Sequence, residues 1–97
     1  VLGRRVVTNG ETVALQPKEF ELLKHLMMHR GTVLTRPRLL NSVWGHEYVG
    51  ERTVDVHVRR VRAKLEAAGT FGLIRTVHGV GYVFEPEDHL EGVARGA

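Results

Sequence analysis

The sequence predicts an α+β fold: a β-hairpin, three helices and a second β-hairpin, in that order. Residues 52–68 combine a narrow apolar stripe with a basic face, which is typical of an amphipathic helix packed on a core. Asn9-Gly10 separates two short runs of β-forming residues, as in a tight hairpin. A glycine-containing turn at 78–81 separates two more such runs, at 72–77 and 82–84.

Length and composition indicate one globular domain. The 97 residues are 42% hydrophobic and 26% charged, which suits a chain with a modest core. No apolar run approaches the ~20 residues of a membrane span, and Val1–Arg5 is unlike a signal peptide, so we expect a cytoplasmic protein with no membrane partner. The absence of cysteine excludes disulfides and thiolate metal sites. Because no Met begins the sequence, we expect a fragment of a longer protein.

Positive charge is concentrated before residue 85. Residues 1–84 hold 13 Lys/Arg against 7 Asp/Glu, whereas residues 85–97 carry a net charge of −3. A basic domain favours nucleic acid or an anionic membrane surface as its partner. We therefore expect a folded domain over residues 1–86 and a flexible, acidic and Gly-rich tail over residues 87–97.

The first half of the chain predicts a hairpin and a core helix. Strands at 4–8 and 11–15 flank Asn9-Gly10, which supplies the two positive φ angles of a type I′ turn. A helix is expected from Pro17 to His29, with Gly31 as its stop. Its apolar stripe is formed by Phe20, Leu23, Leu26 and Met27.

His25 and His29 have the i, i+4 spacing of a helical metal pair. The residues between them supply no general-base Glu, and no third ligand is evident. Two exposed histidines are the favoured interpretation, and we expect neither a metal nor a cofactor.

A second, shorter helix is predicted at about 36–43, after a short strand at 32–35. Thr35 is its N-cap, and Trp44-Gly45 ends it before a loop over residues 45–50. Arg36 and Arg38 lie in its first turn, where cations oppose the helix dipole. Either solvent screens this cost or the two arginines bind phosphates; the second is favoured.

The helix at 52–68 has an apolar stripe and, opposite to it, a basic face. Val54, Val58, Val61 and Leu65 fall on one stripe, and Gly69 ends the helix. The opposite face carries Arg52, Thr53, Val56, Arg59, Arg60, Ala63 and Lys64. Such a run is often only a solvated face. The preceding helix, the following hairpin and the charge distribution instead favour a helix lying in a DNA major groove.

The hairpin after this helix, at about 74–84, has the position of a wing. A wing reaches the DNA backbone or minor groove beside the helix, although the hairpin also covers the core. The short helix, the loop and the long basic helix together form a helix-turn-helix arrangement.

Four segments carry a family resemblance. They are Leu15-Gln-Pro-Lys-Glu-Phe-Glu-Leu-Leu23, Leu39-Leu-Asn-Ser-Val-Trp-Gly45, the helix at 52–65 and Ile74-Arg-Thr-Val-His-Gly-Val-Gly-Tyr82. In this order they resemble the OmpR/PhoB family of bacterial response-regulator effector domains. The resemblance covers about residues 6–84. It implies a winged helix-turn-helix domain that binds specific duplex DNA, commonly as tandem direct repeats. It also implies a loop over 45–50 that touches RNA polymerase, and a missing N-terminal regulatory domain.

The resemblance assigns contacts to matching positions. From the recognition helix it implies contacts by Arg52, Thr53, Val56, His57, Arg59, Arg60 and Arg62. Trp44 and Thr76 are expected at the DNA backbone, with His78 and Tyr82 in or near the wing. Lys64, Arg36 and Arg38 complete the candidate DNA-binding residues.

Two positions depart from the family pattern. His78 stands where relatives usually have Arg, so the wing contact is expected to be weaker or pH-dependent. One hairpin, in place of a four-stranded sheet, precedes the first helix.

A protein-interaction module and an enzyme are the two other function classes. A protein-interaction winged helix would dock the basic helix on an acidic partner, and sequence-dependent DNA binding separates it from the leading interpretation. Catalysis is not expected, because Ser42 is the only serine and no triad order is evident. Asp55 is expected to form a structural ion pair.

Overall fold

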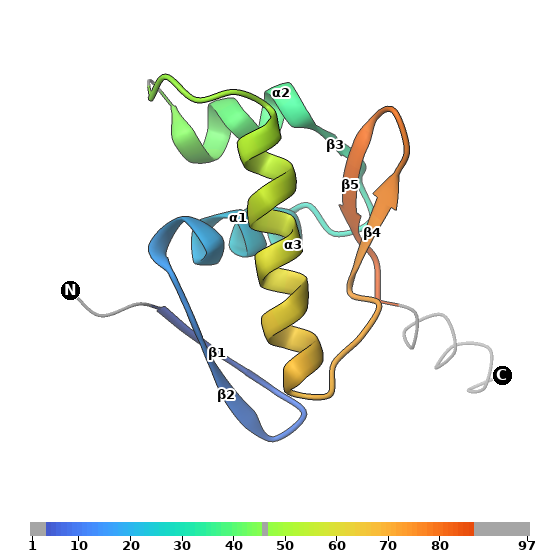
Figure 1. The fold of residues 1–97 in the computed structure, drawn as a ribbon. Helices are drawn as coiled ribbons and strands as arrows, with labels where there is room; N and C mark the ends of the chain where they lie inside the picture. The colour runs from blue at the N-terminus through green and yellow to red at the C-terminus, as the bar shows by residue number, and fades with distance from the viewer. Residues whose placement is uncertain (1–3, 46, 87–97) are drawn as a thin grey trace, which may run out of the picture.

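The computed structural model describes residues 4–45 and 47–86, so the predicted tail at 87–97 lies outside the described residues. A hairpin, β1 (Arg4–Thr8) and β2 (Glu11–Leu15), precedes helix α1 (Pro17–Met28). Strand β3 (Leu34–Thr35), helix α2 (Arg36–Leu39) and the wide turn η1 (Leu40–Trp44) lead to the long helix α3 (Arg52–Ala67). Strands β4 (Ile74–Val77) and β5 (Gly81–Phe84) complete the described fold (Figure 1). The predicted α+β order is confirmed.

The N-terminal hairpin has the predicted turn. Asn9 and Gly10 have φ angles of 51° and 77°, as the type I′ turn requires. Val6 pairs with Val13 in the antiparallel ladder, and Val13 is buried on the core side. The hairpin tip reaches the end of α3, where Asn9 Nδ2 donates to the carbonyl of Ala68 at 3.2 Å.

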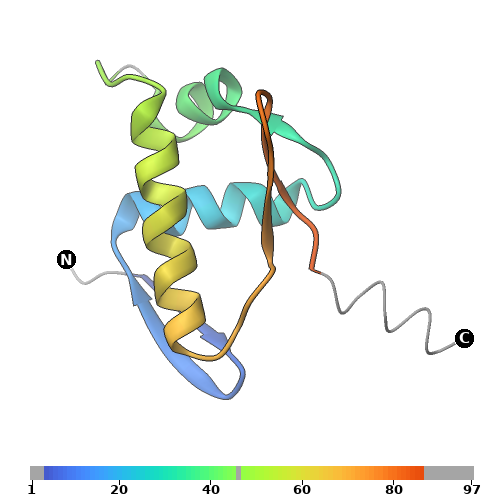
Figure 2. The ribbon, with the colours of Figure 1, turned by 45° about the vertical axis from the view of Figure 1, so that its right-hand side comes forward.

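Helix α1 crosses behind α3 (Figure 2) and contributes Leu22, Leu23 and Leu26 to the core. The predicted stripe was wrong at one residue, because Met27 is 48% exposed and Leu22 takes the buried position. The crossing of α3 selects the buried face, and a helical wheel of α1 alone does not contain this information.

Helix α2 begins as predicted, and the π-helix η1 continues it over the rest of the predicted range. Thr35 Oγ1 accepts the backbone N–H of Arg38 at 3.2 Å, which confirms the N-cap. After Leu39 the helix widens into η1, where the N–H of Gly45 reaches back five residues to the carbonyl of Leu40 at 3.2 Å. The helix predicted to about residue 43 is therefore present and continues to Trp44, but it changes from α to π geometry after Leu39.

Helix α3 buries the predicted stripe. Val54, Val58 and Val61 are 0% exposed and Leu65 is 3% exposed. The helix ends at a glycine with φ of 86°, Gly69, which bonds back to the final turn as a left-handed C-cap does. No helix within the described ranges combines the length and apolar composition that crossing a membrane requires.

The second hairpin belongs to a three-stranded sheet in the order β3-β5-β4. The predicted strand at 32–35 is restricted to Leu34 and Thr35, which pair with Tyr82 and Gly81. A Cβ on Gly81 would lie 2.0 Å from the carbonyl oxygen of Leu34, so this close pairing requires glycine. The sheet therefore holds the second hairpin against the start of α2.

Candidate nucleic-acid interface

The outward face of α3 carries three unpaired cations. Arg52, Arg59 and Arg60 are exposed, and within the described residues none forms a hydrogen bond or an ion pair. Between them lie an exposed Ala63 and a half-buried Val56. Because the stripe on the opposite side is buried, the structure leaves this face available for an anionic partner.

His57 lies at one edge of that face. Its Nδ1 is 2.8 Å from the carbonyl of Thr53, and its ring meets the ring of Trp44 edge-on at 5.0 Å between centroids. Thr53 and His57 are half-buried, whereas Trp44 is only 5% exposed. Trp44 therefore supports His57 from the core, and little of its ring is left for a DNA backbone.

The position predicted for Lys64 requires correction. The wheel placed it on the outward face, but its Nζ lies 2.6 Å from Oε1 of Glu19, whose side chain is 2% exposed. The carboxylate lies beneath the flank of α3 because α1 crosses there. Lys64 thus faces α1 and not the outward face.

A half-buried cluster joins α2, α3 and β5. Asp55 Oδ1 accepts from Arg36 Nε at 2.7 Å and from the Tyr82 hydroxyl at 2.6 Å. Burial tends to raise the pKa of Asp55, but the hydrogen bonds from Tyr82 and Arg36 outweigh it and hold this pKa below its ordinary value. The expected structural ion pair of Asp55 is confirmed, with Arg36 as the partner. Tyr82 is 5% exposed, so its hydroxyl serves Asp55 inside the fold.

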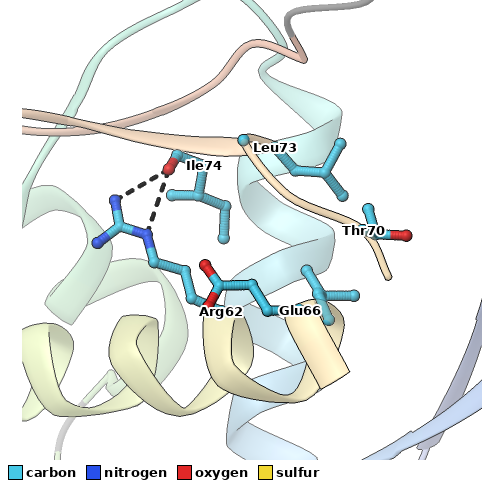
Figure 3. A pocket seen from close by; sticks show the side chains of 7 residues that line it. Arg62, Glu66, Thr70, Leu73 and Ile74 are labelled. Atoms are coloured by element: carbon cyan, nitrogen blue, oxygen red, sulfur yellow. Dashed lines mark hydrogen bonds between the residues drawn. The ribbon is translucent and has the colours of Figure 1, made fainter. Parts of the chain in front are cut away.

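Arg62 is engaged by β4 (Figure 3). Its Nε and Nη2 donate to the carbonyl of Ile74 at 3.2 and 2.9 Å, and Nη2 also donates to Thr76 Oγ1 at 2.7 Å. The adjoining pocket has a volume of about 290 Å³ and is lined by Arg62, Leu65, Glu66, Thr70, Gly72, Leu73 and Ile74. Two candidate contact residues, Arg62 and Thr76, are therefore bonded to each other.

Two further candidates are accessible. His78 is exposed at the turn of the second hairpin, beside Val80, which is 43% exposed. Arg38 is exposed at the start of α2.

The two histidines of α1 were wrongly expected to be exposed. His25 and His29 are half-buried, with ring centroids 4.5 Å apart, and His29 Nδ1 is 3.0 Å from the carbonyl of His25. Within the described ranges, no three His, Cys, Asp or Glu residues gather as a metal site.

Sequence reasoning missed the inward roles of Glu19, Tyr82 and Arg62. For Arg62 a signal was available. Asp55 and Arg62 are seven residues apart, so they lie on the same flank of α3, and the structural role expected for Asp55 indicates that Arg62 also faces the fold. For Glu19 no local signal exists, because its partner is 45 residues away.

Three helices, with a hairpin after the basic third helix, define a winged helix-turn-helix domain. Residues 10–84 match the family model described as "Transcriptional regulatory protein, C terminal". The chain therefore belongs to the OmpR/PhoB-type C-terminal DNA-binding domains of transcriptional regulators, which are not enzymes.

Named relatives agree with this family. Over 86 residues the chain is 51% identical to the sensory transduction protein RegX3 of Mycobacterium tuberculosis (strain ATCC 25618 / H37Rv), covering 84% of this chain and 37% of RegX3. It is 47% identical over 83 residues to the phosphate regulon transcriptional regulatory protein PhoB of Escherichia coli (strain K12), covering 84% and 36%. The chain thus matches little more than a third of the length of these relatives.

Two similar solved structures contain DNA. The DNA-binding domain of the response regulator AdeR, in complex with an intercistronic region, has a TM-score of 0.74 and 32% identity, covering 84% of this chain and 83% of that one. The RstA DNA-binding domain of Klebsiella pneumoniae, in complex with the RstA box, has a TM-score of 0.73 and 39% identity, covering 86% and 84%. These relatives favour DNA binding over a module that docks an acidic protein.

Proposed function

We propose that this chain recognises a specific duplex-DNA sequence, with α3 in the major groove and the β4–β5 hairpin, the wing, at the minor groove. The observation that carries the proposal is the outward face of α3, where the side chains of Arg52, Arg59 and Arg60 are exposed and form no hydrogen bond or ion pair with the residues that the structure describes. An α-helix fits the major groove, and arginine is the residue that most often reads guanine there.

The outward face divides into reading and positioning groups. Arg59 and Arg60 lie mid-helix and reach base edges, whereas Arg52, at the first turn of α3, binds a phosphate. Val56 and Ala63 permit close approach, and Val56 packs on a thymine methyl.

Accessory contacts come from the start of α2, from the wing tip and from the edge of α3. Arg38 at the start of α2 binds phosphate, and His78 at the wing tip enters the minor groove. Thr53 and His57 contact the backbone from the edge of α3, with Trp44 behind His57. Imidazole reaches less far than a guanidinium, so the contribution of the wing is small.

The RegX3 and PhoB relatives are longer, which supports a role as the output part of a larger cytoplasmic regulator. In that protein an N-terminal regulatory domain controls binding to tandem direct repeats on the nucleoid. The loop over 45–50 touches RNA polymerase. Its Tyr48 is fully exposed, and Glu47 forms an ion pair with Lys18 at 2.8 Å that ties this loop to α1.

Selection from a random duplex library at about physiological salt tests this function. We expect an enriched motif of two tandem half-sites, bound more tightly than a scrambled duplex. The affinity should fall steeply with salt, because phosphate contacts release counterions. Equal, weak binding to every duplex would refute sequence-specific recognition by this chain.

A further inference from the structure

The wing is attached to α3 at two separate points. On β5, the Tyr82 hydroxyl donates to Asp55 at 2.6 Å. On β4, Arg62 Nη2 donates to the Ile74 carbonyl and to Thr76 Oγ1, at 2.9 and 2.7 Å. Each strand of the wing therefore has its own bond to the helix.

Both attachments meet at one ring. The Tyr82 ring has the guanidinium carbon of Arg36 5.4 Å from its centroid and that of Arg62 at 5.6 Å. Arg36 also donates to the Asp55 carboxylate that accepts the Tyr82 hydroxyl. Tyr82 is 5% exposed, whereas the side chains of Arg36 and Asp55 are 23% and 38% exposed, so the ring is buried beneath contacts that are only partly shielded from solvent.

The spacing of the two anchors along α3 restricts rotation as well as translation. Asp55 and Arg62 are two helical turns apart, or about 10 Å along the axis. The pairing of β5 with β3 holds one edge of the wing, and two bonds at this separation additionally restrain its tilt relative to α3. The distance from the wing tip to the face of Arg59 and Arg60 is thereby influenced by side chains on the neighbouring flank of α3.

We propose that Asp55 and Arg62 are positioning residues, which clamp the wing through Tyr82 and β4 so that α3 and the wing meet DNA as one rigid unit. This inference rests on the proposed function for its consequence in binding. It assigns Tyr82, Arg62 and Thr76 an effect on DNA affinity that acts through the position of the wing.

The first test uses the free protein. Tyr82→Phe keeps the stacked ring and removes the bond to Asp55. We expect the backbone amides of Gly79 and Val80 to show a lower ¹⁵N heteronuclear NOE in this variant than in the parent. Tyr48→Phe, which removes the same hydroxyl from a fully exposed loop residue, is the matched control and should leave them unchanged. Unchanged wing-tip relaxation in a folded Tyr82→Phe would overturn the clamp.

The second test uses the selected duplex and a double-mutant cycle. His78→Ala should weaken binding by about three- to tenfold in the parent, the value of one hydrogen bond. In Tyr82→Phe the same change should cost less than about twofold, because a released wing has already lost the contact. Equal losses in both backgrounds, or no loss in the parent, would refute the coupling. A purely structural role for Tyr82 would alter the melting temperature without producing this coupling.

The third readout separates contact from positioning at Arg62. Arg62→Gln should weaken binding, while the slope of log affinity against log salt stays that of the parent. A phosphate contact would instead lower this slope by about one. If the parent selects no duplex, the proposed function fails, and the relaxation measurement still decides whether the clamp exists.

Discussion

Lys64 Nζ lies 2.6 Å from Oε1 of Glu19, and this contact ties the recognition helix α3 to the first turn of α1. The same carboxylate oxygen accepts the backbone N–H of Gln16 at 2.8 Å, which caps α1. One buried acid therefore serves a helix cap and a contact between helices, 45 residues apart in sequence. Lys64 is the half-exposed partner, at 36%.

Removal of Lys64 should destabilise the domain. Lys64→Met would leave the Glu19 carboxylate buried with a single backbone donor, at a cost of about 1–3 kcal/mol in the free energy of unfolding. Lys18→Met is the matched control, because the Lys18–Glu47 pair is exposed at 37% and 52% and should cost less than about 1 kcal/mol. Urea unfolding measures both, and equal stability of Lys64→Met and the parent would contradict a supporting role for the pair.

The contact between Glu19 and Lys64 should also affect the stability of the domain at acid pH. Burial tends to raise the pKa of Glu19, but the hydrogen bonds from Lys64 and Gln16 outweigh it and leave the pKa below its ordinary 4.5. A carboxyl with a lowered pKa contributes stability above its ordinary value, and this is lost as pH falls through the lowered one. In Glu19→Gln the free energy of unfolding should decline less steeply below about pH 4.5. If the free energy of unfolding of Glu19→Gln declined with falling pH as steeply as that of the parent, the lowered pKa assigned to Glu19 would be contradicted.

His25 should make stability depend on pH nearer neutrality. Burial lowers its pKa below the ordinary 6.5, with His29 and Arg38 adding to the effect, and its Nε2 has no hydrogen-bond partner within the described residues. Glu21 and Lys24 lie around the same small pocket. The neutral form is favoured on folding, so stability should fall as pH drops below about 6.5 until the lowered pKa is passed. His25→Leu should remove this decline, measured by urea unfolding at several pH values; a parallel decline in both proteins would exclude His25 as its source.

Val58 and Arg59 are adjacent in sequence but lie on different faces of α3. Val58 is 0% exposed, so Val58→Asp would bury a charge at a cost of several kcal/mol, comparable to the whole stability of a small domain. Circular dichroism should find this variant unfolded at 25 °C. Arg59→Asp, one residue further on, should remain folded. A folded Val58→Asp would disprove the burial assigned to this stripe.

The elements that could be predicted depend on local patterns. The stripe of Val54, Val58 and Val61 follows the helical period, and Asn9-Gly10 has the geometry of its turn whatever surrounds it. Periodicity gives the angle of a side chain around its own helix. For that reason most residues of the outward face of α3 could be predicted from the sequence.

Partners that are distant in sequence could not be predicted. The pairing of Leu34 with Tyr82 makes a third strand, yet a two-residue strand carries no pattern of its own. The inward turn of Lys64 depends on where α1 crosses α3. A charge near the edge of a wheel can face solvent or a buried partner, and tertiary packing decides which.

Arg60 tests the central claim, because it is exposed, lies off the buried stripe and has no partner within the described chain. The measurement is the ratio of affinities for the selected duplex and a scrambled one, in the parent, Arg60→Ala and Arg30→Ala. We predict that Arg60→Ala keeps the parent's circular dichroism spectrum and loses about tenfold or more of this ratio, as expected for one arginine–guanine contact. Arg30→Ala, an exposed arginine just after α1, should keep the ratio. A folded Arg60→Ala with the parent's ratio would contradict recognition through this face of α3.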